Sequence, residues 1–282
     1  MNCAISVTPC GSYEENISFF QILKAAGFSY IGLEFQKAKW LEEADWEEKA
    51  DSLAKAIADS GMIASAAHLA TYPLDIGLSV QYPQIEEQIR RSVMACVKVK
   101  APRWIAHLRS AIDQGYSKEI AAEQNARDFA WILDLAVKHG CALSFENLPV
   151  FPDYPGSKYY SSNPKELREF VESFHSEAVG ICLDTGHLHM MLNDDESESI
   201  RILGDKINLI EINNNWIRFD SHMLPSAGSI DWTRLGKDIA GIGYQGDLLL
   251  EANPAAVPEI APEYYAHGRD CLKVIKERIE NA

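Results

Sequence analysis

Short apolar runs alternate with amphipathic segments along the whole chain. Eight of these runs have the composition of buried strands, and they cover residues 4–8, 30–35, 63–68, 104–107, 142–146, 180–184, 208–213 and 247–251. Near-continuous apolar runs of this length are typical of parallel strands that are covered on both faces. The pattern therefore predicts a parallel sheet with helices packed on it.

The segments between the runs have helical periodicity. The clearest covers residues 120–139, where apolar residues recur at helical spacing until Gly140 ends the helix. Similar helices are predicted at residues 17–26, 46–60, 85–99, 164–174 and 264–279, with a short one at residues 200–203 after an acidic stretch. About eight strand–helix units without a flexible linker predict an α/β fold, a single (β/α)8 TIM barrel that forms one domain over residues 1–282.

Four of the late apolar runs end on a carboxylate. The four acids are Glu146, Asp184, Glu211 and Glu251. The carboxyl ends of parallel strands meet at one face of an α/β barrel, which is where such folds keep their chemistry. Because carboxylates gathered there repel one another unless a cation or protons intervene, we expect these side chains to bind a divalent metal ion. Oxygen ligands favour Mn²⁺ or Mg²⁺, with Zn²⁺ as the alternative.

Charge and cysteine content narrow the partners and the compartment. The 41 acidic and 26 basic residues leave a net charge of −15, which disfavours nucleic acid and anionic membranes as partners. The six cysteines include no Cys-x-x-Cys pair, so we expect reduced thiols. No apolar stretch approaches the length of about 20 residues that a membrane span needs, and no signal peptide is evident. We therefore expect a cytoplasmic protein.

Four of the eight histidines lie at the same end of the predicted strands as the acids. His68 and His107 end the third and fourth predicted strands, while His187 and His222 follow the sixth and seventh. A lone histidine is more often a rim or core residue, but four at one rim are candidate metal ligands or substrate contacts.

Several rim residues are candidates for holding a substrate. Arg109 and Arg218 are the cations that would bind a phosphate group, although each is more often a surface arginine. Trp216 or Tyr72 would supply an apolar wall against the C–H face of a sugar, with ordinary loop packing as the alternative. Residues 149–163 form the longest loop-like segment, which is either a substrate-covering loop or a surface excursion.

Five segments carry a family resemblance in order along the chain. They are residues 144–147 (SFEN), 182–187 (CLDTGH), 220–222 (DSH), 228–232 (GSIDW) and 241–251 (GIGYQGDLLLE). Together they resemble the xylose isomerase-like barrel superfamily, which includes sugar phosphate isomerases and epimerases and the zinc apurinic endonucleases. The resemblance implies that Glu146 and Glu251 are paired glutamates that bind the metal and transfer protons, and that Asp184 is a third ligand. The family usually has histidine as the fourth ligand, where this chain has Glu211.

The resemblance also extends to the endonuclease branch of the superfamily. His68, His107, His187, Asp220 and His222 resemble ligand positions of the trinuclear zinc endonucleases. Against this reading stand Glu211 in place of a histidine and an acidic chain where DNA would need a basic face.

The expected function is a divalent-metal-dependent sugar, or sugar phosphate, isomerase or epimerase. Glu146 and Glu251 would transfer the proton through an enediolate, and a histidine such as His187 would orient a substrate hydroxyl. Three alternatives stay open: a metal-dependent lyase or dehydratase of an inosose-like or keto-acid substrate, a zinc apurinic endonuclease-like phosphodiesterase, and a non-catalytic sugar-binding barrel. The partner is expected to be a small sugar or a related polyol ketone. A homodimer or homotetramer, common among relatives, is a further possibility that no segment of the sequence marks.

Overall fold

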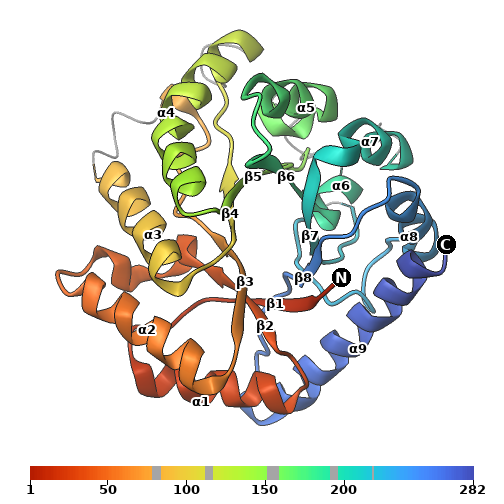
Figure 1. Cartoon of the computed structure of the whole chain (residues 1–282). Helices are drawn as coiled ribbons and strands as arrows, with labels where there is room; N and C mark the ends of the chain where they lie inside the picture. Colours follow the sequence, from red (N-terminus) through yellow and green to blue (C-terminus); the bar gives the residue numbers. More distant parts are fainter. Residues whose placement is uncertain (78–83, 112–116, 151–158, 191–195, 218) are drawn as a thin grey trace.

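The computed structural model describes residues 1–77, 84–111, 117–150, 159–190, 196–217 and 219–282. Eight strands lie side by side in chain order and form a closed barrel (Figure 1). They are β1 (Cys3–Val7), β2 (Tyr30–Glu34), β3 (Ile63–His68), β4 (Arg103–His107), β5 (Ala142–Glu146), β6 (Val179–Asp184), β7 (Ile207–Ile212) and β8 (Asp247–Leu250). All eight pairings are parallel, and β1 closes the barrel by pairing with β8, where Ala4 lies opposite Leu249. The predicted (β/α)8 TIM barrel is confirmed.

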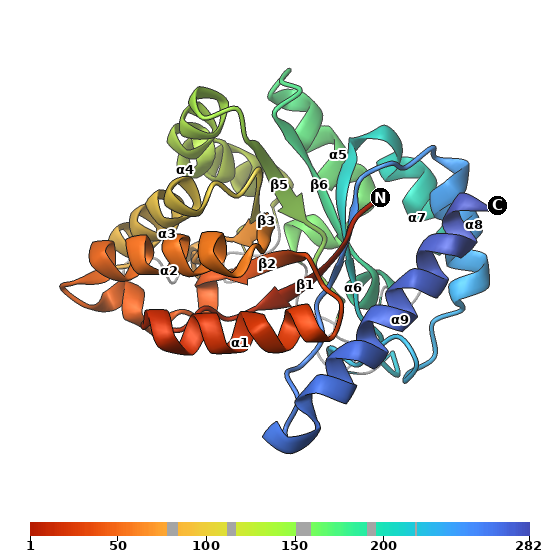
Figure 2. The same ribbon diagram turned by 60° about the horizontal axis from the view of Figure 1, so that its bottom comes forward.

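Helices surround the barrel on its outside, as Figures 1 and 2 show. They are α1 (Tyr13–Ala25), α2 (Trp46–Ser60), α3 (Ile85–Val99), α4 (Lys118–Lys138), α5 (Pro164–Ser173), α6 (Thr185–His189), α7 (Glu196–Leu203), α8 (Trp232–Gly241) and α9 (Ala261–Glu280). Short 3₁₀ turns lie at Phe35–Lys37, Lys39–Glu42, Tyr160–Ser162, Gly204–Lys206 and Pro258–Ile260. Among the described residues, none of the helices combines the length and apolar composition that a membrane span requires.

Three helices differ from the sequence-based expectation. The short α6, Thr185–His189, directly follows β6 and is missing from the predicted helix ranges. The short helix expected at residues 200–203 begins earlier, at Glu196, because the polar residues before Ile200 lie in its first turn. The helix α8 between β7 and β8 is also missing from the predicted helix ranges. It has only ten residues and begins where the Asp231 carboxylate accepts hydrogen bonds from the backbone N–H groups of Thr233 and Arg234.

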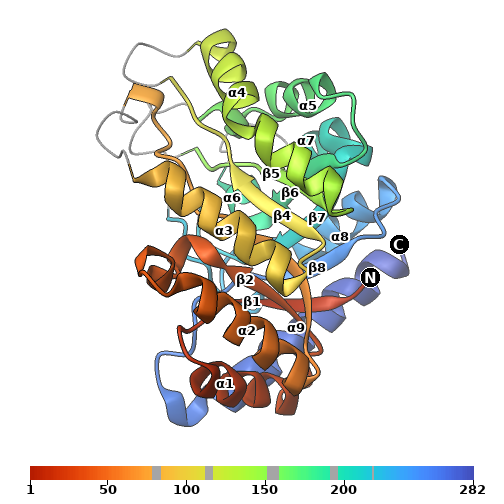
Figure 3. The same cartoon turned by 60° about the vertical axis from the view of Figure 1, so that its left-hand side comes forward.

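The core has two layers. Most buried apolar side chains lie between the sheet and the helices, and a smaller cluster fills the inside of the barrel. The inner cluster consists of Ala4, Ala66, Ile105, Cys182, Leu209 and Leu249. Figure 3 shows both chain ends on the same side of the molecule. Because β1 begins there, the opposite end of the barrel is the one where the strands end.

Candidate metal centre at the barrel mouth

An ionisable side chain lies at or next to the carboxyl end of every strand from β2 to β8. In strand order these are Glu34, His68, His107, Glu146, Asp184, Glu211 and Glu251. Parallel pairing places neighbours at the same level: Glu34 lies opposite His68, His107 opposite Glu146, and Asp184 opposite Glu211. The strand ends therefore bring together residues that are up to 217 positions apart in the sequence, from 34 to 251.

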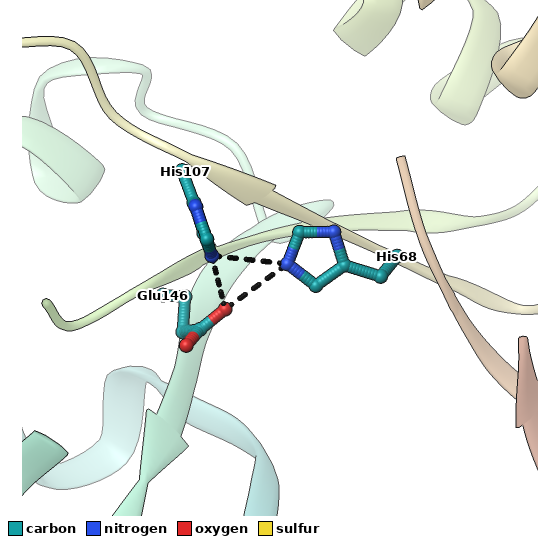
Figure 4. Close-up of side chains that lie close together, drawn as sticks. All are labelled: His68, His107 and Glu146. Atoms are coloured by element: carbon teal, nitrogen blue, oxygen red, sulfur yellow. Dashed lines mark hydrogen bonds and ion pairs between the residues drawn. The ribbon is translucent and has the colours of Figure 1, made fainter. Parts of the chain in front are cut away.

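Glu146 lies at the centre of a cluster with two histidines (Figure 4). Its Oε2 is 2.8 Å from Nε2 of His107 and 3.2 Å from Nε2 of His68, and the two histidine nitrogens are 3.1 Å apart. The other ring nitrogen of His68, Nδ1, lies 2.9 Å from the carbonyl oxygen of Leu69 and must donate to it. Nε2 of His68 faces Glu146, and a carbonyl oxygen on the other ring nitrogen is the arrangement that orients metal-binding histidines.

In this cluster the carboxylates stabilise the protonated form of His68, and the histidines stabilise the ionised form of Glu146. Burial alone would lower the pKa of His68, but the carboxylates of Glu146 and Glu34 outweigh burial and raise it to about 9. Conversely, burial would raise the pKa of Glu146, and the surrounding histidines, His107 first, hold it well below its ordinary value. Glu146 is therefore ionised although it is only 2% exposed.

A second cluster joins His187, Asp220 and His222. Oδ2 of Asp220 is 3.1 Å from Nε2 of each histidine. Nδ1 of His187 lies 3.0 Å from Oε1 of Glu146, and Nδ1 of His222 lies 3.3 Å from Oε2 of Glu251. The second cluster thus connects the two glutamates through histidines. His222 adopts a positive φ of 41°, an unfavourable backbone conformation that is often found where side-chain position matters.

Asp184 is fully buried between these clusters. Its Oδ1 accepts a hydrogen bond of 2.6 Å from the backbone N–H of His187, and its Oδ2 accepts one of 2.6 Å from Nδ2 of Asn213. Burial, together with the charges of Glu251 and Glu146, raises the pKa of Asp184 to about 7. Both oxygens of Asp184 keep a lone pair that a cation could use.

Glu211 belongs to a different group from the one the sequence predicts. It forms a ligand group with Glu34 and Glu251, in which one ligand oxygen of each residue lies within 4.8 Å of the others. Oε2 of Glu211 accepts a hydrogen bond of 3.2 Å from the thiol of Cys182, but its Oε1 has no partner among the described residues. Burial and the neighbouring acids, Glu251 first, raise the pKa of Glu211 well above its ordinary value.

Five groups of three side chains can hold a metal ion within the described residues. They are His68–His107–Glu146, His187–Asp220–His222, Glu146–Asp184–His187, Asp184–His222–Glu251 and Glu34–Glu211–Glu251. Asp184 shares one group with Glu146 and another with Glu251, and the two glutamates do not occur together in any of these five groups. Glu211 shares a group with Glu251 alone among the predicted ligands.

Two cavities open at this end of the barrel. One of about 250 Å³ is lined by both paired glutamates, and one of about 310 Å³ extends toward β1 and α9. They share Lys37, His222 and Glu251. The ammonium group of Lys37 lies 3.4 Å from Oε2 of Glu34 and 3.7 Å from Oε1 of Glu251. Lys37 and Glu34 are missing from the sequence-based prediction. Phe35 follows Glu34 within the predicted run 30–35, so Glu34 does not mark the end of that run as the predicted acids do.

The predicted substrate contacts are only partly brought together. His107, His187 and His222 line the smaller cavity. His68 is 1% exposed and does not line it, but it contacts His107 and Glu146, which do. Trp216 lies in the loop after β7, is 60% exposed and lines neither cavity. Arg218 lies outside the described residues, as do residues 151–158 of the predicted covering loop.

Arg109 and Tyr72 contact each other and do not line the two cavities. The guanidinium of Arg109 is ion-paired with Asp128 and lies 5.0 Å from the centre of the Tyr72 ring. The Tyr72 hydroxyl donates a hydrogen bond of 3.0 Å to Glu86. Both residues are buried, and neither lines the two cavities at the mouth.

Comparison with known proteins places this chain in a family. It belongs to the xylose isomerase-like TIM barrel family, whose model matches residues 20–275. A curated relative, the D-psicose 3-epimerase of Enterocloster bolteae, is 27% identical over 93 residues, which are 33% of this chain and 29% of that protein. The alignment with that epimerase thus spans less than a third of its length.

Solved structures share the fold over the whole chain. A D-tagatose 3-epimerase-like protein has a TM-score of 0.76 and 17% identity, with 100% of this chain and 99% of that chain covered. The AP endonuclease of family 2 from Brucella melitensis has a TM-score of 0.67 and 15% identity, with 95% and 99% covered. At such low identities the likeness shows the fold alone. Which reaction this chain catalyses therefore has to be argued from the residues of its own site.

Proposed function

We propose that this chain is a divalent-metal-dependent sugar epimerase or isomerase that moves a proton beside a carbonyl group. The observation that carries the proposal is that Glu146 and Glu251 line the same cavity from two different strands, with Asp184 buried between their histidine partners. Two carboxylates on either side of one substrate carbon can remove a proton and return it.

The cation would be held by Asp184 together with Glu146 and Glu251, and with His187 or His222. The fit rests on the donor set: Asp184 forms one ligand group with Glu146 and His187 and another with His222 and Glu251. When bound, a divalent ion supplies Lewis acidity that polarises a carbonyl oxygen and offsets the developing negative charge. Carboxylate ligands favour Mn²⁺ or Mg²⁺. Zn²⁺ is the alternative because imidazole nitrogens also bind it well.

The protein side chains would perform the proton transfer. Glu146 is ionised because His107, His187 and His68 surround it, so it is prepared to accept a proton from a carbon atom. Glu251, which contacts Lys37 and His222, would enter the step carrying a proton of its own and donate it, while Glu146 keeps the proton it removed. Both carboxyl groups would then exchange protons with solvent before the next turnover. Return to the opposite face of the same carbon gives an epimer, and return to the next carbon gives an isomer.

The size and charge of the site support a small neutral sugar. The cavity that both glutamates line has a volume of about 250 Å³, below the lower end of the range of about 300–1,000 Å³ for drug-sized ligands. Among its described lining residues, Lys37 is the one lysine or arginine, and it already faces two carboxylates. Arg109, the predicted phosphate contact, is paired with Asp128. Similarity to proteins named as 3-epimerases of psicose and tagatose also supports a ketose.

The test is exchange of substrate hydrogen with solvent. The full-length chain with Mn²⁺ in D₂O is incubated with a panel of ketoses, and deuterium incorporation is followed by mass spectrometry. We expect incorporation at one carbon of at least one ketose, and its loss in Glu146→Gln and Glu251→Gln. No incorporation with any ketose, while Mn²⁺ stays bound, would overturn the proposal in favour of a sugar-binding barrel. Incorporation accompanied by loss of water would instead identify a lyase.

A second candidate, a phosphodiesterase of the endonuclease type, is favoured by one observation. The groups His68–His107–Glu146 and His187–Asp220–His222 provide histidine-rich sites beyond the single ion that proton transfer needs. A net charge of −15 opposes binding to DNA. Three bound zinc ions per chain together with cleavage of DNA at abasic sites would establish this candidate, and intact abasic DNA with the zinc-loaded protein would exclude it.

A further inference from the structure

Lys37 has a position at the barrel mouth that no other described residue shares. Among the described residues, it alone lines both cavities at the mouth and also a third cavity of about 240 Å³ beside the turn after β2. Its side chain is 52% exposed, whereas those of Glu34 and Glu251 next to it are 4% and 8% exposed. The ammonium group is therefore accessible to a molecule bound in the cavities.

The turn that carries Lys37 is held in place by the core. It is the 3₁₀ turn Phe35–Lys37, which directly follows β2. Phe35 is 1% exposed and packs edge-on against Trp40, with 6.1 Å between the ring centres. The indole N–H of Trp40 donates a hydrogen bond of 2.9 Å to the carbonyl oxygen of Pro9. The backbone of Lys37 is thus fixed, while its flexible side chain can reposition the ammonium group.

The two acids that Lys37 faces also have histidine partners. Nδ1 of His222 lies 3.3 Å from Oε2 of Glu251. Glu34 lies opposite His68 in the sheet. Burial would raise the pKa of Glu34, but the charge of His68, followed by that of Lys37, lowers it below its ordinary value. Lys37 therefore adds positive charge beside acids that histidines already stabilise in their ionised form.

The contacts of Lys37 with these acids are loose. Its Nζ lies 3.4 Å from Oε2 of Glu34 and 3.7 Å from Oε1 of Glu251. Strong charge-assisted hydrogen bonds have lengths of about 2.7–2.9 Å, and an ammonium group has three N–H donors. Burial would lower the pKa of Lys37, but Glu34 and Glu251 raise it above its ordinary value, so the group stays cationic. At least one N–H donor is consequently available to an oxygen atom of a bound substrate.

The contact with Glu251 brings this donor close to the reacting atoms. In the proposed function, Glu251 donates a proton to a substrate carbon, so that carbon and its neighbouring oxygen atom lie next to the Glu251 carboxyl group. When Glu146 removes a proton, the C–H electrons form the C=C bond of the enediolate and the carbonyl π electrons move to oxygen. A cation in a partly buried site stabilises the charge that develops on this oxygen.

We propose that Lys37 is a catalytic residue whose ammonium group donates a hydrogen bond to the substrate oxygen that becomes negatively charged when Glu146 removes the proton. Lys37 keeps its own protons throughout, and the electrons return to the carbonyl carbon–oxygen bond or its isomeric equivalent when Glu251 protonates carbon. Because two carboxylates already face Lys37, this role suits a charge that develops during the reaction better than a permanent phosphate group. The inference rests on the proposed function.

The experiment measures turnover of the full-length chain at saturating Mn²⁺ in D₂O, with the ketose that the wild type labels fastest. In Lys37→Met we expect kcat for deuterium exchange to fall about 100- to 1,000-fold with KM unchanged, because the lost interaction forms only in the transition state. Lys39→Met is the matched control. Lys39 is exposed, begins the next 3₁₀ turn and lines neither cavity at the mouth, so its kcat should equal that of the wild type.

Rescue by a small cation separates a catalytic role of Lys37 from a structural one. Methylammonium should restore part of the lost kcat in Lys37→Ala, which leaves space for it, and should leave Lys37→Met unchanged. If Lys37→Met fails to fold in a thermal unfolding scan, Lys37→Gln takes its place with the same expected loss. Wild-type kcat in the variant, a rise in KM alone, or no rescue of Lys37→Ala would overturn the inference and leave the proposed function standing. A wild type that labels no ketose would instead end the proposed function, and this inference with it.

Discussion

Asn213 holds Asp184 in place through a hydrogen bond of 2.6 Å from its Nδ2 to Oδ2 of the carboxylate. Both residues are 0% exposed, and they come from β6 and the segment after β7. The backbone N–H of Asn213 in turn donates to the Thr185 hydroxyl at 3.1 Å. The geometry of the predicted metal ligand therefore depends on a residue outside the predicted ligand set.

Replacing Asn213 should weaken metal binding. In Asn213→Leu, Asp184 loses its donor and its fixed rotamer, and we expect Mn²⁺ affinity to fall about 10- to 100-fold, as for other partners of metal ligands. Isothermal titration calorimetry measures the change. The control is Asn208→Leu, since Asn208 accepts a hydrogen bond of 2.8 Å from Ser144 and contacts no predicted ligand. Equal loss of affinity in both variants would contradict the role of Asn213.

Gly186 should not tolerate a side chain. A Cβ added there would lie 1.9 Å from Oδ1 of Asn213 and 3.1 Å from Nδ2 of Asn215. We expect Gly186→Ala to cost about 1–3 kcal/mol in the free energy of unfolding and to lower Mn²⁺ affinity by displacing Asn213. Gly241→Ala is the control because nothing lies within 4 Å of the added methyl group. Urea unfolding that gave both variants wild-type stability would refute this packing argument.

Arg109 should stabilise the fold rather than bind substrate. Its side chain is 4% exposed and pairs with Asp128, whose side chain is 11% exposed. Arg109→Met leaves that acid without its partner, and we expect a loss of about 3–5 kcal/mol of unfolding free energy. The double variant with Asp128→Asn should recover part of the loss. If the single variant is stable but a sugar phosphate no longer binds, Arg109 contacts substrate after all.

The ion pairs of Glu196 should depend on pH. His189 and Arg234 lower the pKa of Glu196 below its ordinary value, although partial burial acts in the opposite direction. A lowered carboxyl pKa adds stability above the unfolded value that is lost as pH falls through the folded value. Glu196→Gln should therefore cost about 1.5 kcal/mol at pH 7, as for hydrogen bonds to charged groups, and much less near pH 3. Urea unfolding at both pH values checks this, and a pH-independent difference would contradict it.

The barrel fold was predictable because the sequence patterns that indicate its strands and helices each lie within a short segment of the chain. Each strand is a short apolar run and each helix has its own periodicity, so the order of β and α elements follows from neighbouring residues. The short helix α8 was missed because ten residues show little helical periodicity. Its start is marked mainly by Asp231, whose side chain caps the helix N-terminus. Acids at strand ends were likewise visible as endings of apolar runs.

The composition of the ligand groups was not predictable, because it depends on barrel closure. Glu34 and Glu211 are 177 positions apart in the sequence, yet their oxygens lie within 4.8 Å. Which acid faces which neighbour is decided by strand register and side-chain direction, and neither appears in a single sequence. For the same reason Arg109 looked like a free rim cation, whereas its partner Asp128 is supplied by α4.

The central claim is that Asp184, Glu146 and Glu251 jointly hold a divalent ion at the barrel mouth. Anomalous diffraction from crystals grown with Mn²⁺, recorded at the manganese absorption edge, tests it most directly. The account predicts an anomalous peak within coordination distance, about 2.0–2.3 Å, of oxygens from all three side chains. A well-ordered mouth without such a peak, or a peak held by other residues, would contradict it.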